Sequence, residues 1–514
     1  MPTSLQSFST LKGAYITTPF SISSAAEVEQ VLQDAVAASI PFNKKTFIER
    51  AEFLEAIANE IMELGDLLLE KTHEETALPI ARLTGERGRT CTQLKLYANL
   101  LRNGSWCDAV IDTAMPERQP LPRADLRRIL QPIGPVLVFG ASNFPYAYST
   151  AGGDTASALA AGCPVIVKAH ESHLGTNNLV AKAILKAAEK TGMPKGVFAS
   201  LVGTGPVLGQ QLASDERIQA IGFTGSYKAG MALYTTATQK RKTPIPVYAE
   251  MSSINPVILL PQILSQKTAS IAAALAGSIS LGVGQFCTSP GLIFALNDDA
   301  TQSFAAELAT ALAAVSPATM LNPQICNTYY ADKKQLARTK NIKIIFEGSE
   351  LSELFQATPA LMQTTAVHFM DNPALQKEIF GPCSLLVVCK NEAELYAAIE
   401  SMEGQLTGSI YGSTEELIQH QPLVDTLQQK VGRLIFNNAP TGVEVCNAIV
   451  HGGPFPATTD ARTTSVGPEA IRRFVRPVCY QDCPEALLPL YLRNSNEAGI
   501  LRLVNGVLTK EGVV

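Results

Sequence analysis

Short apolar strands that alternate with helical segments begin near residue 129, and this alternation decides the fold class. The first strand spans 135–140, and the next three span 164–168, 197–202 and 218–223. Because strands joined by helical crossovers lie parallel in one sheet, the pattern predicts a doubly wound α/β domain. A second α/β pattern runs from about residue 255 to 447, so we expect two such domains.

The segments outside these two patterns have a different character. Most of the first hundred residues keep apolar side chains at helical spacing. A helix capped by Thr176 or Asn177 is expected to run over 179–190. Residues 115–126, rich in proline and arginine, predict a loop or extended arm, and the tail from Ala470 predicts short extended pieces.

Composition and charge exclude several classes of protein. The chain has 514 residues, 46% of them hydrophobic and 17% charged, which indicates a globular protein with a large core. The net charge of -5 and the lack of a basic block give no support for nucleic-acid binding or for a charged membrane-binding patch. Residues 268–297 carry no charge, but their small residues, Gln285 and Pro290 favour a buried helix leading into a strand over a membrane span.

The cysteines and histidines point to a reduced, metal-free protein. None of the ten cysteines forms a Cys-x-x-Cys pair, and their wide scatter does not suggest a disulfide framework. No signal-peptide pattern is present, so we expect a cytoplasmic location. There is no His-Glu-x-x-His motif, and His170 and His173, three residues apart, are expected to pack in a loop rather than to bind metal.

One cysteine lies in a setting suited to chemistry on a carbonyl group. Cys287 stands in Gly-Gln-Phe-Cys-Thr-Ser-Pro-Gly, and Glu250 lies 37 residues upstream, after an apolar strand. A thiolate can attack a carbonyl carbon, and a buried carboxylate with a raised pKa can activate water near neutral pH. The alternative for Cys287 is a small buried side chain that only packs, and the alternative for Glu250 is a structural ion pair.

Three further turns follow strand ends. Asn143 follows the first strand, where its amide could donate to an oxyanion or could simply serve a turn. Gly203-x-Gly205 and Gly225-Ser226 follow later strands and could let the backbone approach a pyrophosphate. The glycine fingerprint is incomplete, because Leu208 stands where the third glycine belongs, so ordinary tight turns remain an alternative.

Taken together, six motifs in order resemble those of the aldehyde dehydrogenase superfamily. The resemblance implies Cys287 as nucleophile, Glu250 as general base and Asn143 as oxyanion donor. It also implies a set of residues that bind the coenzyme: Lys168, Glu171, Gly203, Gly205, Gly225, Ser226, Glu378 and Phe380. Two departures stand out, since Met251-Ser252-Ser253 replaces Leu-Gly-Gly and Tyr227-Lys228 replaces Thr-Glu.

The resemblance also implies an architecture of two doubly wound α/β domains and a small β oligomerisation arm. Residues 1–109 and 134–250 would form the coenzyme-binding domain, and residues 251–469 the catalytic domain. Residues 110–133 and 470–514 would form the arm and tail. By the same resemblance we expect a homodimer or a homotetramer.

The activity implied is the NAD(P)-dependent oxidation of an aldehyde to a carboxylic acid through a cysteine thioester. The bacterial branch of the superfamily that this sequence resembles suggests 2-oxoglutarate semialdehyde as the substrate, with Arg462 and Phe455 as its contacts. Glu171 would repel a 2′-phosphate, so NAD is favoured over NADP. The alternatives are an NADP-dependent oxidation of fatty or other aliphatic aldehydes, a CoA-acylating relative and a non-enzymatic structural descendant.

Overall fold

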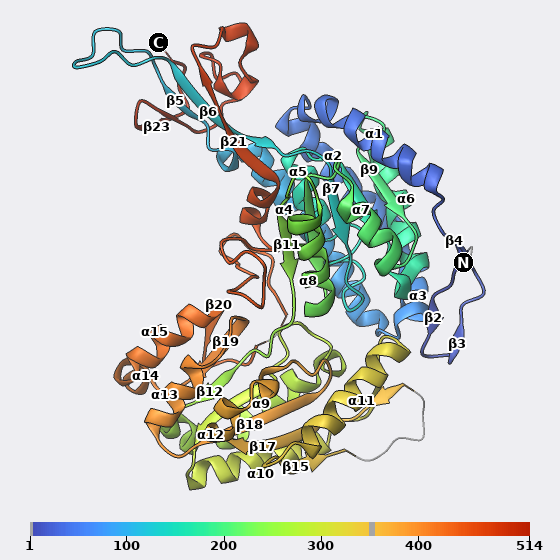
Figure 1. Ribbon diagram of the computed structural model, residues 1–514, viewed down its shortest axis with the longest axis vertical. Helices are drawn as coiled ribbons and strands as arrows, with labels where there is room; N and C mark the ends of the chain where they lie inside the picture. Colours follow the sequence, from blue (N-terminus) through green and yellow to red (C-terminus); the bar gives the residue numbers. More distant parts are fainter. Residues whose placement is uncertain (1–3, 349–354, 441, 514) are drawn as a thin grey trace.

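The computed structural model describes residues 4–348, 355–440 and 442–513. Three sheets organise these residues, and Figure 1 shows two α/β bodies with a slender sheet projecting from one of them. Three small two-stranded ribbons complete the strand inventory: β1 (Ser4–Leu5) with β4 (Phe20–Ser21), β2 (Phe8–Ser9) with β3 (Ala14–Tyr15), and β14 (Ala318–Thr319) with β16 (Gln356–Ala357).

The first sheet has five parallel strands in the order β11-β10-β7-β8-β9. Its central strand β7 is apolar throughout because both faces of the sheet are covered by helices. The chain runs outward from β7 in one direction and then returns to the other side of β7, which makes the end of β7 a switch point. The strands are β7 (Val136–Phe139), β8 (Val165–Lys168), β9 (Phe198–Leu201), β10 (Ala220–Thr224) and β11 (Val247–Glu250).

Helices from the N-terminal region and from the crossovers cover this sheet (Figure 1). They are α1 (Ala25–Asn43), α2 (Phe47–Glu63), α3 (Gly65–Thr76), α4 (Ile80–Asn103), α5 (Gly153–Ala161), α6 (Leu174–Lys190), α7 (Gln210–Ser214) and α8 (Tyr227–Thr235). Helix α6 begins five residues before the sequence predicts, so the expected caps Thr176 and Asn177 are wrong. The carboxylate of Glu75, from α3, accepts hydrogen bonds from the amides of Gly175 and Thr176 and so satisfies the first turn from a distance.

The second sheet has seven strands in the order β15-β17-β18-β13-β12-β19-β20, of which only the β15–β17 pair is antiparallel. Its strands are β12 (Val257–Leu259), β13 (Leu292–Leu296), β15 (Lys343–Glu347), β17 (Ala360–Thr365), β18 (Cys383–Cys389), β19 (Gln405–Tyr411) and β20 (Val431–Phe436). Its helices are α9 (Pro261–Ser280), α10 (Asp299–Ala313), α11 (Pro323–Arg338), α12 (Ala366–Asp371), α13 (Glu392–Glu400), α14 (Thr414–Gln419) and α15 (Gln421–Lys430).

The uncharged stretch forms α9, a short turn and β13, as the sequence predicts. Among the described residues, Pro261–Gly284 is the one segment long and apolar enough to cross a membrane by length and composition. Helix α9 nevertheless packs against α10, and its residues Ile271 and Leu275 belong to the core beside the second sheet. Core packing therefore explains the apolar residues on the buried side of α9.

The third sheet joins two distant parts of the chain. Its order is β21-β6-β5-β22-β23, and Figure 1 shows it at the end of the molecule that carries the C-terminus. The strands are β5 (Val110–Asp112), β6 (Leu126–Pro132), β21 (Val475–Gln481), β22 (Arg502–Val504) and β23 (Val507–Thr509). Residues near 110–133 thus pair with strands of the tail.

Candidate active site

The carboxyl ends of all five strands of the first sheet carry a residue predicted to belong to the site. Because these strands are parallel, their carboxyl ends lie along one edge, where ligands bind in sheets of this type. Along the chain, these residues are Asn143 after β7, Lys168 at the end of β8, Gly203 after β9, Gly225 after β10 and Glu250 at the end of β11.

Cys287 lies on a tight loop between α9 and β13. The loop needs Gly284, whose φ is +65° and whose position would bring a Cβ into the backbone of Gly381. This close approach places the nucleophile loop against the segment that holds Glu378 and Phe380. The side chain of Asn255 donates to the backbone carbonyl of Cys287 at 2.8 Å and so holds the loop in place.

Glu250 is buried and held from two sides. Its Oε2 accepts a hydrogen bond from Ser465 Oγ at 2.8 Å, and its Oε1 lies 3.0 Å from Nε2 of His451. Burial alone would raise the pKa of Glu250, but the interaction with His451 and the hydrogen bonds from His451, Ser465 and Cys287 outweigh it. The pKa therefore lies below its usual value, and the expectation of a raised pKa is wrong.

His451 completes a triad that the sequence did not suggest. Its Nε2 lies 3.4 Å from Cys287 Sγ, and its side chain is completely buried. Burial raises the pKa of the Cys287 thiol well above its usual value, and the charge of Glu250 raises it further. Because Nε2 faces both the sulfur and the carboxylate, an N–H at this position stabilises whichever of them is anionic.

One sequence signal could have indicated His451. It precedes Gly452-Gly453 in a segment without a helical or strand pattern. A Cβ on either glycine would overlap neighbouring backbone carbonyls, at Thr463 for Gly452 and at Gln405 for Gly453. A glycine pair beside a histidine in such a segment marks a close approach of backbones, which often accompanies a site.

Asn143 lies beside the nucleophile loop. Its Nδ2 donates to the carbonyl of Gln285 at 3.0 Å, which leaves the second N–H of the amide available. Arg82 donates to the carbonyl of Asn143 at 2.6 Å and lies over the rings of Phe144 and Phe286, 5.0 Å from each centroid. These contacts hold the amide of Asn143 against the loop that bears Cys287.

The end of β8 and the turn after β9 form a second polar group. Glu171 Oε1 lies 3.0 Å from Lys168 Nζ and accepts a hydrogen bond from the Gly205 amide at 3.1 Å. No neighbouring atom lies within 4 Å of the position of a Cβ on Gly205, whereas one on Gly203 would overlap Leu208. Gly205 therefore opens onto space beside Glu171, and Gly203 serves close packing.

The turn after β10 starts a helix. Ser226 caps α8 by accepting from the amide of Ala229, and the amide of Gly225 donates to the carbonyl of Glu250 at 3.1 Å. The N-terminus of α8 thus lies directly beside the end of β11. An open glycine, a carboxylate for sugar hydroxyls and a helix N-terminus along one sheet edge fit a dinucleotide.

Glu378 contacts Ser252 and Ser253, the two serines that stand in place of Gly-Gly after Glu250. It accepts hydrogen bonds from the Ser252 side chain and the Ser253 backbone, while burial raises its pKa to about 7.

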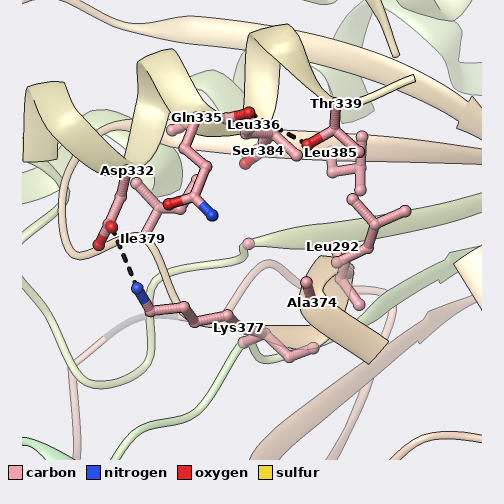
Figure 2. Close-up of a pocket in the computed structure, with 14 residues that line it drawn as sticks. Leu292, Asp332, Gln335, Leu336, Thr339, Ala374, Lys377, Ile379, Ser384 and Leu385 are labelled. Carbon is pink, nitrogen blue, oxygen red and sulfur yellow. Dashed lines mark hydrogen bonds and ion pairs between the residues drawn. The ribbon is translucent and has the colours of Figure 1, made fainter. Parts of the chain in front are cut away.

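Lys377 pairs with Asp332 of α11 at 3.0 Å, and Figure 2 shows this pair at the edge of a pocket lined by Leu336, Ile379 and Leu385. Cys287, Glu250 and His451 do not line this pocket. Phe380, two residues after Glu378, is half-buried.

The two substrate contacts predicted from the sequence are both exposed side chains. The side chain of Arg462 is 88% exposed and pairs with Asp460 at 2.8 Å, so its guanidinium is engaged by that carboxylate in this structure. Phe455 is exposed, with its ring 6.1 Å from that of Tyr227 at the start of α8.

Another arginine lies near the nucleophile instead. Arg89, on α4, donates to the hydroxyl of Tyr148 at 3.3 Å, and its guanidinium lies 5.2 Å from the centre of that ring. The Tyr148 ring is 5.9 Å from the ring of His451. The charge of Arg89 also lowers the pKa of Cys287, against the larger effect of burial. Its Nη1 is buried without a hydrogen-bond partner in the described part of the chain.

This fold and this triad define an enzyme that works on a carbonyl group beside a nucleotide site. The family model "Aldehyde dehydrogenase family" matches residues 4–454, and the chain belongs to that family. It is therefore an NAD(P)-dependent oxidoreductase that converts an aldehyde to a carboxylic acid.

Three similar proteins refine the comparison. "Alpha-ketoglutaric semialdehyde dehydrogenase 2" of Azospirillum brasilense is 50% identical over 98% of this chain and 96% of its own length. "Alpha-ketoglutaric semialdehyde dehydrogenase" of Acinetobacter baylyi is 47% identical over 96% of this chain and 93% of its own length. The crystal structure of succinic semialdehyde dehydrogenase from Streptococcus pyogenes in complex with NADP+ shares the fold with a TM-score of 0.76. Its identity is 18%, over 92% of this chain and 99% of that one.

Proposed function

We propose that this enzyme oxidises 2-oxoglutarate semialdehyde to 2-oxoglutarate. The observation that carries this proposal is the similarity over nearly the full length to two proteins named for that substrate. Arg89 supports it, because a cation with an uncommitted donor beside the triad suits a substrate that carries a carboxylate.

The first chemical step in this proposal uses Cys287 and Glu250. The thiol proton passes to the Glu250 carboxylate, with which the thiol is hydrogen bonded. The sulfur then forms a bond to the aldehyde carbon, and the carbonyl oxygen becomes an oxyanion. The second N–H of Asn143 and the backbone N–H of Cys287 donate to that oxyanion.

The nicotinamide nucleotide, when bound, supplies the hydride acceptor. Lys168, Glu171 and Gly205 would hold its adenosine half, and Glu378 and Phe380 its nicotinamide half. As the oxyanion re-forms the carbonyl and the C–H hydrogen leaves as hydride to that acceptor, a thioester remains on Cys287. Glu250, after releasing its first proton to solvent, takes a proton from water, the water oxygen attacks the thioester carbon, and the acid leaves as the Cys287 sulfur is restored. A small cavity lined by Thr458 and Ser465 opens onto Glu250 and would admit that water.

The nucleotide preferred in this proposal is NAD. Glu171 lies with Lys168 and Gly205 at the sheet edge proposed for the adenosine half, where its charge would disfavour the 2′-phosphate of NADP. Lys168 already pairs with Glu171 and so offsets part of that repulsion.

Assembly and location complete the proposal. We infer a homodimer or homotetramer formed through the third sheet, whose surroundings expose Leu121, Leu487, Val507 and Leu508. Light scattering on the purified protein tests this. The ten cysteines are all free, which suits a reducing cytoplasm.

The decisive experiment compares kcat/KM for 2-oxoglutarate semialdehyde with that for an unbranched aliphatic aldehyde, using NAD. We expect a preference of at least tenfold for the carboxylated substrate. A preference for the aliphatic aldehyde, with NADP, would instead identify a fatty-aldehyde enzyme.

A further inference from the structure

The reactive triad has the geometry of a transition-metal site. The ligand atoms of Glu250, Cys287 and His451 all lie within 4.8 Å of one another. Nε2 of His451 is 3.4 Å from Sγ and 3.0 Å from the carboxylate oxygen. A tetrahedral zinc ion, with bonds of about 2.3 Å to sulfur and about 2.1 Å to nitrogen and oxygen, separates such atoms by about 3.4–3.6 Å. The two distances that Nε2 of His451 makes are therefore within about half an ångström of those in a zinc site.

We propose that Cys287, His451 and Glu250 form a reversible binding site for a borderline-soft divalent cation, represented by Zn²⁺. One sulfur, one imidazole nitrogen and one carboxylate oxygen are ligands that zinc prefers. The thiolate and the carboxylate together neutralise the two charges of the ion. Mg²⁺ and Ca²⁺, which require mostly oxygen ligands, should not bind there.

The bonding changes are simple. The thiol proton is released to solvent and a sulfur–metal bond forms. The imidazole binds through Nε2, with its proton on Nδ1, and the fourth position of the ion is left for water. No electron transfer is involved.

Neighbouring residues already orient two of the ligands. Ser465 donates to Oε2 of Glu250 at 2.8 Å, which leaves Oε1 facing the imidazole. Asn255 holds the backbone carbonyl of Cys287. Nδ1 of His451, in contrast, is buried with no hydrogen-bond partner within residues 4–348, 355–440 and 442–513. In most metal sites the second nitrogen of a bound histidine donates a hydrogen bond that strengthens metal binding. Because Nδ1 of His451 makes no such bond, we expect metal binding weak enough for a chelator to reverse.

Metal binding would occupy the sulfur and the carboxylate that the proposed mechanism uses. Inhibition competitive with the aldehyde follows, and this consequence rests on the proposed function. The binding itself does not, because it depends only on the three side chains.

The binding test is a titration of the metal-free, full-length protein with Cd²⁺, followed by the thiolate-to-cadmium absorption band. We expect one strongly bound ion per chain that Zn²⁺ displaces and Mg²⁺ does not. Cys287→Ala should remove the band, and His451→Asn and Glu250→Gln should each weaken binding at least tenfold. Cys446→Ser is the matched control, because that cysteine is exposed and lies outside the triad.

Two results would overturn the site: an undiminished band in Cys287→Ala, or unchanged affinity in both His451→Asn and Glu250→Gln. Circular dichroism of each variant shows that it is folded. The rate assay with Zn²⁺, with and without EDTA, is a separate arm. If Cd²⁺ and Zn²⁺ bind the triad while turnover is unaffected, the metal site stands and the assignment of Cys287 as nucleophile fails.

Discussion

His451 Nε2 lies 3.4 Å from Cys287 Sγ, although 164 residues separate the two along the chain. The same nitrogen lies 3.0 Å from Glu250. The imidazole therefore links the nucleophile and the carboxylate, and its removal should affect the reactivity of the thiol itself.

His451→Gln should slow alkylation of Cys287 by iodoacetamide about tenfold or more near neutral pH. The buried thiol already has a raised pKa, and without the imidazole N–H its thiolate loses a stabilising donor. In both proteins the rate should rise with pH, because only the thiolate reacts. His420→Gln, a buried histidine that contacts Tyr396, is the control and should react like wild type. Equal alkylation rates in His451→Gln and wild type would mean that the imidazole does not act on the sulfur.

Cys287→Ala should abolish aldehyde oxidation while coenzyme affinity stays within about twofold of wild type. The sulfur is the group that bonds to substrate, whereas the residues proposed for the adenosine half of the coenzyme lie at the end of β8 and after β9. Nicotinamide absorbance measures turnover, and tryptophan fluorescence or calorimetry measures binding. Residual turnover above about one part in a thousand would exclude this cysteine as the nucleophile.

Arg89→Gln should lower kcat/KM for the carboxylated semialdehyde by about 10–100-fold, the range expected for losing a charged hydrogen bond. An uncharged aldehyde of similar length should be affected much less. Arg462→Gln is the matched control, because that arginine is exposed and paired with Asp460, and it should stay within twofold. A uniform loss for both aldehydes in Arg89→Gln would indicate a structural role through Tyr148.

Glu171→Ser should raise kcat/KM for NADP relative to NAD at least tenfold. The change removes the carboxylate that would repel a 2′-phosphate and frees Lys168 to bind it. Glu189→Ser, an exposed glutamate at the end of α6, serves as the control. A wild-type enzyme that prefers NADP, or an unchanged ratio in the variant, would show that Glu171 does not discriminate.

Coenzyme binding should strengthen as pH rises through about 7. Burial raises the pKa of Glu378 to about 7, so its carboxyl group is protonated below that pH and ionised above it. Only the ionised form is a full acceptor for ribose hydroxyls, and affinity can change at most tenfold per pH unit below the pKa. Calorimetry between pH 6 and pH 8 should show tighter NAD binding at the higher pH, and Glu378→Gln should flatten the profile. A steep profile in the variant would assign the titration to another group.

The sequence predicted most strand ends correctly, because an apolar run and the small or polar residue that ends it are both local features of the chain. An apolar run followed by a small or polar residue predicts the end of a buried strand, and Lys168 and Glu250 lie at such ends. The start of α6 was not predictable, because its first amides are satisfied by Glu75, about a hundred residues earlier. The pKa of Glu250 and the exposure of Arg462 were missed for a similar reason: each depends on a partner or a path of the chain that periodicity does not encode.

Glu250 is the last residue of a strand in the first sheet, Cys287 precedes a strand of the second, and His451 belongs to the segment that returns between them. The three reacting side chains meet only while the two α/β bodies are docked. Mild denaturant or heat that loosens this docking should therefore inactivate the enzyme while each sheet is still intact. Loss of activity would then precede loss of the far-ultraviolet dichroism signal, and activity is the more sensitive measure of native inter-domain packing.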